Sequence, residues 1–258
     1  MSFEFKKKYG QNFLTDKNLL SSIVKDASIE SQDEVLEIGA GMGALTQEIA
    51  KVAKKVVAFE IDESLKQYLE NLNLKNVDFI FADALKTDMA AIENNFSGNF
   101  KLVANLPYYI TSPLIFKFLK ESEKITSLSI MVQEEVGRRI CAEAGSSDYG
   151  ALSVSCQFFG KPRIMRKVGR KMFTPSPDVD SCIVRLDITR REDIDATKFL
   201  SLVKMAFKSR RKTLLNNLAE GLGVSKSSLS KIEILQRRAE QLSVDEFVSL
   251  AQSLQQSL

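Results

Sequence analysis

Short apolar runs alternate with longer amphipathic segments through the first half of the chain. Apolar, β-rich runs predict strands at residues 34–38, 55–59, 77–81, 100–104 and 127–132. The segments between them predict helices, at residues 45–53, 65–72, 113–119 and 134–144. Strands separated by helices are typical of βαβ units, so we expect an α/β fold with a mostly parallel central sheet and helices on both faces.

The pattern changes towards the C-terminus. Runs at residues 152–159 and 181–188 predict two more strands that form an antiparallel edge. Residues 189–195 are charged and predict a linker, after which everything predicts helices. The first is expected to run from residue 200 to the glycines at 221 and 223, because apolar side chains recur with a helical period: Leu200, Val203, Phe207 and Leu214. Further short helices are expected at residues 227–229, 234–240 and 244–254. We therefore expect two domains, residues 1–190 and a small all-α domain at residues 191–258.

The composition excludes several kinds of catalysis. The 258-residue chain contains no histidine, which removes Ser-His and Cys-His nucleophiles, histidine bases and most catalytic zinc sites. Its three cysteines form no CxxC pair, so neither a metal site nor a disulfide framework is expected. No run of eighteen apolar residues and no signal-peptide core occurs, and we expect a cytoplasmic protein with reduced thiols.

Basic residues are clustered although the formal net charge is only +3. Residues 161–171 and 204–212 each hold several lysines and arginines and no acid, and residues 6–8 are a third basic cluster. Acid-free clusters of this kind favour a polyanion partner. The candidate RNA-binding residues are Lys161, Arg163, Arg166, Lys167, Lys204, Lys208, Arg211 and Lys212.

A glycine-rich turn follows the first predicted strand of the sheet. Gly39, Gly41 and Gly43 form a GxGxG pattern between this strand and a helix, where glycine lets the backbone turn tightly and approach a ligand. Glu60 ends the next strand, 21 residues after Gly39, a spacing that suits a carboxylate binding ribose hydroxyls. Asp83 follows the third strand, where it can accept a hydrogen bond from the amino group of an adenine.

These strand ends predict a nucleoside cofactor. A dinucleotide would need phosphate ligands and usually a longer glycine signature. S-adenosylmethionine has no phosphate and suits the glycine turn, Glu60 and Asp83 together. We therefore expect S-adenosylmethionine as the methyl donor and no metal.

The tetrapeptide Asn105-Leu106-Pro107-Tyr108 follows the fourth strand, where the methyl group of such a cofactor would point. The Asn105 side chain can accept a hydrogen bond from an exocyclic amine, Pro107 fixes the turn, and Tyr108 offers a ring for stacking.

The chain resembles the bacterial small-subunit (16S) ribosomal RNA adenine dimethyltransferases, relatives of the large-subunit erythromycin-resistance methyltransferases. The resemblance rests on motifs that follow one another along the whole chain, at residues 9–14, 37–46, 105–108, 133–136, 173–181 and 207–212. It implies a Rossmann-like class I methyltransferase domain and a small helical domain that binds RNA or the ribosome. It also implies that Asn12, Leu14, Gly39 and Asn105 contact the cofactor.

The resemblance further implies the reaction. Two adjacent adenosines in the 3′-terminal hairpin loop of small-subunit RNA would each receive two methyl groups on N6, during assembly of the subunit. An enzyme that modifies a base must take it out of its stack, and Tyr108 and Phe173 are the expected stacking faces, with Phe173 in a proline-stiffened loop rather than in the core. The amine would bond to Asn105 and to the carbonyl of Leu106. We expect a monomer acting on an immature small subunit.

Two other readings remain open from the sequence. One is a large-subunit RNA methyltransferase. The other is a non-catalytic assembly or RNA-binding factor on the same fold, which the joint presence of Gly39, Glu60, Asp83, Asn105 and Tyr108 argues against.

Overall fold

The chain divides into two compact units in the computed structural model, which describes residues 13–14, 16–230 and 232–257. The first unit combines Met1–Gly137 with Arg163–Ile188, and the second combines Arg138–Pro162 with Thr189–Leu258. The second break lies close to the boundary expected near residue 190. The sequence placed residues 138–162 in the first domain, whereas they group with the C-terminal helices.

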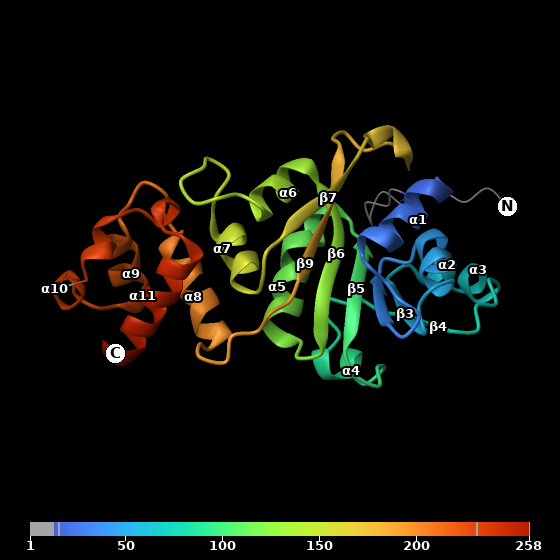
Figure 1. Ribbon diagram of the computed structural model, residues 1–258, viewed down its shortest axis with the longest axis horizontal. Coiled ribbons are helices and arrows are strands. Elements are labelled where there is room, and N and C mark those ends of the chain that lie inside the picture. The colour runs from blue at the N-terminus through green and yellow to red at the C-terminus, as the bar shows by residue number, and fades with distance from the viewer. Residues whose placement is uncertain (1–12, 15, 231, 258) are drawn as a thin grey trace. The chain divides into compact units, whose positions relative to one another are not determined.

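Seven strands of the first unit form one sheet in the order β4-β3-β2-β5-β6-β9-β7 (Figure 1). The strands are β2 (Glu34–Ile38), β3 (Lys55–Glu60), β4 (Val77–Phe81), β5 (Phe100–Asn105), β6 (Ile125–Gln133), β7 (Arg163–Val168) and β9 (Ser181–Asp187). β2 to β6 pair in parallel, and β9 runs antiparallel to both β6 and β7. The expectation of a mostly parallel α/β sheet is confirmed.

Helices connect these strands. They are α1 (Lys17–Asp26), α2 (Ala44–Ala50), α3 (Lys66–Glu70), α4 (Met89–Glu93), α5 (Thr111–Glu121) and α6 (Glu134–Ile140), with short 3₁₀ turns η2 (Glu63–Leu65), η3 (Tyr108–Ile110) and η4 (Arg170–Met172). Asp16 caps α1 by accepting a 2.8 Å bond from the Leu19 amide. One buried cluster joins sheet residues such as Val35, Val103 and Met131 to the apolar sides of α1 and α2.

A two-stranded ribbon lies outside the main sheet. β1 (Phe13–Leu14) pairs antiparallel with β8 (Phe173–Thr174), so that Phe13 is opposite Thr174 and Leu14 is opposite Phe173. Leu14 and Phe173 are both buried. The ribbon therefore brings the start of the described chain against a segment about 160 residues further on.

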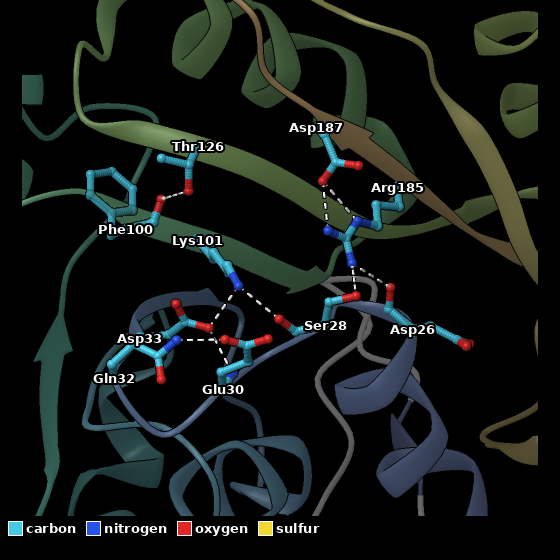
Figure 2. A network of polar contacts seen from close by, with 10 residues as sticks. All are labelled: Asp26, Ser28, Glu30, Gln32, Asp33, Phe100, Lys101, Thr126, Arg185 and Asp187. Carbon is cyan, nitrogen blue, oxygen red and sulfur yellow. Dashed lines mark hydrogen bonds and ion pairs between the residues drawn. The ribbon is translucent and has the colours of Figure 1, made fainter.

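Polar contacts brace the edge of the sheet where the parallel strands begin (Figure 2). Lys101 of β5 donates 2.7 Å bonds to the Ser28 carbonyl and to Asp33 Oδ2, in the connection between α1 and β2. Arg185 of β9 binds Asp187 and donates to the Asp26 carbonyl and the Ser28 hydroxyl. The end of α1 is thereby fixed to two strands at this edge, which leaves the opposite edge for a ligand.

The second unit is helical. It contains α7 (Ala151–Phe158), α8 (Ala196–Ala206), α9 (Leu214–Leu222), α10 (Lys226–Leu229), η5 (Glu233–Gln236), η6 (Ala239–Gln241) and α11 (Val244–Ser257). Stacked rings form its core, with centroids 3.9 Å apart for Phe158 and Phe199 and 5.8 Å apart for Phe207 and Phe247. No helix in the described parts of either unit is long and apolar enough to span a membrane.

Three local predictions are wrong. Residues 152–159 form α7 instead of a strand, because a helix buried on nearly every side, including Ser153 and Ser155, loses the one-sided period that marks a helix. The antiparallel edge is instead made by β7, within a segment in which only basic side chains attracted attention. The single helix expected after residue 200 is two helices, and Lys208, Arg211 and Lys212 lie in the turn between them.

Candidate active site

A cavity of about 240 Å³ lies at the carboxyl ends of β2, β3, β4 and β5. The chain order reverses beside β2, since β3 and β4 lie on one side of it and β5 on the other. Such a switch point is where open α/β sheets bind ligands. The cavity brings together every described residue that the sequence assigned to the cofactor or the base: Leu14, Gly39, Gly41, Glu60, Asp83, Asn105, Leu106, Pro107, Tyr108 and Phe173. Asn12 lies outside the described residues.

The glycine turn forms one wall of the cavity. Gly39 and Gly41 have φ values of +83° and +56°, which side-chain-bearing residues rarely adopt. A Cβ at Gly39 would lie 3.2 Å from the Asn105 carbonyl oxygen, and one at Gly41 would lie 2.8 Å from the Phe13 ring. Glycine at these positions therefore leaves room between the turn, the end of β5 and the β1 strand.

The Glu60 carboxylate holds this turn in place from the end of β3. Its Oε2 accepts a 2.7 Å bond from the Gly41 amide, and its Oε1 accepts 2.9 Å bonds from the amides of Ile61 and Asp62. Burial raises the pKa of Glu60 above its ordinary value, and the three amides offset part of that rise. Glu60 thus lines the cavity and also orders its glycine wall, a contact that spacing alone did not reveal.

Glu37 is a second buried carboxyl group at this end of the sheet, two residues before Gly39. Burial raises its pKa to about 8, the Thr46 hydroxyl lowers it in part, and the charge of Glu60 adds to the rise. Glu37 does not line the cavity. It therefore belongs to the packed interior behind the glycine turn.

Asp83 lies beyond the end of β4. Its Oδ1 accepts a 3.0 Å bond from the Leu85 amide, which fixes the side chain, and Lys86 Nζ is 3.6 Å from its Oδ2. Because Asp83 is only partly buried and lines the cavity, its carboxylate can still accept from a ligand amine.

Asn105 to Tyr108 form the wall opposite the glycine turn. Asn105 ends β5 half-buried, Leu106 is buried, and Pro107 begins the 3₁₀ turn that contains Tyr108. The Tyr108 hydroxyl is 3.0 Å from the buried Ser181 hydroxyl at the start of β9, so its ring is held in one position. Burial raises the pKa of Tyr108, which therefore stays neutral.

Phe173 lines the cavity but is only 4% exposed and belongs to the main hydrophobic cluster. The expectation that its loop position argues against core packing is wrong, because the β1–β8 pairing buries the ring. Phe173 is both a core residue and part of the wall.

The lining also fits a nucleoside cofactor that carries positive charge and no phosphate. Its described residues include two carboxylates, Glu60 and Asp83, and neither a lysine nor an arginine, so it offers no cationic phosphate ligand. Apolar side chains such as Leu14, Ile61 and Leu85 supply flat surfaces for a purine. S-adenosylmethionine, which has a sulfonium and an ammonium group, fits this donor and acceptor set.

The sequence missed three residues around the cavity. Ile61 is a partly exposed apolar side chain that follows Glu60, and its position after a strand-end acid was the available signal. Tyr109 is exposed and adjoins Tyr108. Ser181, the last residue of the motif at 173–181, gave no sign that it would bind Tyr108, because the two lie 73 residues apart.

The basic cluster at residues 161–171 is less cationic in space than in sequence. Three of its cations each lie 2.8 Å from a distant carboxylate, in the pairs Arg163–Asp187, Arg166–Asp26 and Lys167–Glu134. No described carboxylate lies within ion-pairing distance of Lys161. The absence of neighbouring acids in the sequence therefore overstated the free charge of this segment.

The cluster at residues 204–212 shows the same effect in the second unit. Glu220 of α9 binds Lys208 at 2.7 Å and Lys212 at 3.0 Å, and these two ammonium groups lower the pKa of Glu220 to about 2. Lys204 and Arg211 have no such partner among the described residues. These two cations remain available to an anion.

A doubly wound sheet with this cavity at its switch point defines a Rossmann-like methyltransferase that uses S-adenosylmethionine. The family described as "Ribosomal RNA adenine dimethylase" matches residues 2–256, and the chain belongs to this family. A relative from Alkaliphilus oremlandii, named ribosomal RNA small subunit methyltransferase A, is 45% identical over 99% of this chain and 94% of its own. One of the same name from Caldanaerobacter subterraneus subsp. tengcongensis is 46% identical, over 96% and 97%.

Solved structures agree. A dimethyladenosine transferase from Plasmodium falciparum superposes with a TM-score of 0.77 at 27% identity, covering 95% of this chain and 98% of its own. The 23S rRNA methyltransferase ErmE superposes with a TM-score of 0.67 at 25% identity, covering 93% and 100%. Both similarities extend over nearly the whole chain and include the helical second unit.

Proposed function

We propose that this enzyme uses S-adenosylmethionine to dimethylate the N6 amines of two adjacent adenosines in the 3′-terminal hairpin loop of small-subunit (16S) ribosomal RNA. The observation that carries the proposal is the convergence of Asn105, Leu106 and Tyr108 with the nucleoside-binding strand ends in one cavity. The relatives that match almost end to end, at 42–46% identity, are named for methylation of the small-subunit RNA, which favours this substrate over the large-subunit RNA.

Positioning supplies most of the catalysis in this proposal. The N6 lone pair of adenine is delocalised into the ring, so the free amine is a weak nucleophile. Hydrogen bonds from the amine to the Asn105 side chain and to the Leu106 carbonyl localise that pair and orient it towards the cofactor. When bound, S-adenosylmethionine supplies a methyl group on a positively charged sulfur.

Proton transfer needs no strong base under this scheme. The amine proton becomes acidic once nitrogen carries the new methyl group, and it leaves to solvent after transfer. Preorganised acceptors and correct alignment are sufficient for such a step. This suits a chain without histidine. The same pocket must accept the monomethylated amine in a second round.

Tyr108 and Phe173 provide the walls for the extruded base in this proposal. The Ser181 bond fixes the Tyr108 ring, and a fixed ring loses little entropy when a base stacks on it. Phe173 contributes from within the core, so the base meets at most part of its ring. Gly39, Gly41, Glu60, Asp83, Leu14 and Asn12 form the cofactor side.

The RNA partner would be an immature small subunit in the cytoplasm, bound by a monomer of this chain. Structured RNA is recognised chiefly through its shape and phosphates, which requires exposed cations. Lys161, Lys204 and Arg211 are the strongest candidates, since the other five expected contacts already bind carboxylates.

Replacing Asn105 by alanine tests the assigned chemistry. Transfer of labelled methyl to immature small subunits should fall by at least about a hundredfold, as for loss of an oriented transition-state contact, while subunit affinity stays within about twofold of wild type. Asn95→Ala is the matched control, because Asn95 is also half-buried but lies outside the cavity. A parallel loss of subunit affinity and activity in Asn105→Ala would contradict the assignment.

Primer extension identifies the RNA that is modified. Two methyl groups on N6 block reverse transcription, so paired stops near the 3′ end of the small-subunit RNA are expected after reaction with the wild-type enzyme. Stops only in large-subunit RNA would favour the activity named for ErmE. Binding of subunits without any methyl transfer would favour a non-catalytic assembly factor.

A further inference from the structure

Tyr109 has an environment that the proposed reaction does not yet use. It directly follows Tyr108 in the η3 turn and lines the same cavity. Its side chain is 65% exposed, more than any other large hydrophobic side chain among the described residues. It makes no hydrogen bond or ring contact with any of them. An exposed ring is therefore held at the rim of the site by a backbone whose neighbours are fixed.

Its neighbour shows how differently the two consecutive tyrosines are placed. Tyr108 is half-buried and bound to Ser181, whereas Tyr109 projects from the next position of the same turn into solvent. The Ile110 amide donates a 3.1 Å bond to the Pro107 carbonyl, which closes the turn around both residues. One ring thus belongs to the interior of the cavity and the other to its mouth.

Exposure alone does not mark a site, since isolated apolar side chains are common on protein surfaces. Tyr68 of α3 is such a case, because it is 45% exposed but does not line the cavity. The distinguishing property of Tyr109 is that its exposed ring and the base-binding tetrapeptide share one rim. Any polynucleotide that inserts a base between Asn105 and Tyr108 must pass across that rim.

We propose that Tyr109 stacks on the nucleobase next to the one being methylated. The inference rests on the proposed function, in which the two target adenosines are adjacent. While one adenosine occupies the cavity, the other remains outside at its mouth, deprived of its stacking neighbour. An aromatic side chain offers such an unstacked base a sequence-tolerant surface. Tyr109 would serve in the same way whichever adenosine is inside.

The proposal separates binding from chemistry. Base–aromatic stacking corresponds to about a 5- to 150-fold change in affinity per base. Tyr109→Ala should raise KM for immature small subunits about tenfold or more, with KM for S-adenosylmethionine and kcat within about twofold of wild type. Tyr109→Phe should keep wild-type values, since the ring and not the hydroxyl is used. Tyr68→Ala, the matched control, should change none of them.

A second substrate identifies the partner of the ring. Small subunits are assembled on RNA in which one of the two target adenosines is replaced by an abasic nucleotide, and methylation of the other is measured. Wild-type enzyme should lose about the same factor in KM that Tyr109→Ala loses on intact RNA, and Tyr109→Ala should lose nothing further. This non-additivity is expected only if the ring and the missing base contact each other.

Two results would overturn the inference. One is a wild-type KM for Tyr109→Ala on intact subunits. The other is multiplication of the two effects, which would show that Tyr109 and the neighbouring base act independently. The wild-type enzyme on intact subunits is the separate arm for the proposed function, because absence of methyl transfer there refutes the reaction itself and this inference with it. Melting temperatures of all variants exclude misfolding as the cause of a raised KM.

Discussion

Replacing Glu60 by glutamine should weaken cofactor binding with little change in the volume of the side chain. The amide oxygen can keep the two 2.9 Å bonds from Ile61 and Asp62. The amide nitrogen then faces the Gly41 N–H at the 2.7 Å position, where two donors oppose each other. The glycine turn must shift away from the geometry that shapes the cavity.

The magnitude follows from the bond that is lost. A hydrogen bond to a charged group contributes about 1.5–3 kcal/mol, which corresponds to an affinity for S-adenosylmethionine about 10- to 150-fold weaker. The free energy of unfolding should change less, since burying a neutral amide costs less than burying a carboxylate whose pKa is raised by burial. Isothermal titration calorimetry measures the affinity, and urea unfolding measures the stability.

Glu34→Gln is the matched control for this experiment. Glu34 is as buried as Glu60, with 6% and 5% exposure, but it lies at the opposite end of the adjacent strand and accepts from Ser97 and Lys54. Its replacement should lower stability and leave cofactor affinity within about twofold. Wild-type affinity in Glu60→Gln, or equal weakening in both variants, would refute the role given to the Glu60–Gly41 bond.

Two further predictions concern charge. Because burial raises the pKa of Glu37 from 4.5 to about 8, the folded chain binds a proton that the unfolded chain releases, and the free energy of unfolding should fall by several kcal/mol between about pH 4.5 and pH 8. Glu37→Gln should lack this decline in urea titrations across that range, and equal pH slopes for both proteins would contradict the assignment. For RNA binding, Lys204→Ala with Arg211→Ala should reduce the slope of log affinity against log salt by about 1.5–2, since two unpaired cations are removed. Lys208→Ala with Lys212→Ala should reduce it less, because a carboxylate already competes for those ammonium groups; filter binding across a salt series compares the pairs, and an equal reduction would show that ion pairing is irrelevant.

The sheet and its ligand edge were predictable because parallel strands carry a local signal. Buried strands read as apolar runs, and their carboxyl ends must meet at one edge, so Glu60, Asp83 and Asn105 were placed together by topology alone. Asn12, expected at the same site, lies outside the described residues. The glycines were recognisable for the same reason, since Gly39 and Gly41 occupy backbone conformations that other residues avoid.

The failures share a different physical origin. Helix α7 is buried around most of its circumference, so its sequence shows no single apolar face. Contacts between distant residues leave no local trace either, as with Tyr108 and Ser181 or Arg166 and Asp26. The burial of Phe173 likewise depends on strand β1, about 160 residues earlier. Long-range pairing, rather than local pattern, decides which candidate side chains are exposed and which cations are free.

The β1–β8 ribbon has a consequence for the order in which this protein is made. Phe13 and Leu14 emerge first from the ribosome, but their partners, Thr174 and Phe173, are synthesised when about two thirds of the chain is complete. Until then the nascent chain holds the glycine turn, Glu60, Asp83 and Asn105 without the wall that encloses them. Closing so long a loop also carries a large entropic cost, which favours late formation. The pocket is therefore completed in time well after the residues that define its chemistry have been translated.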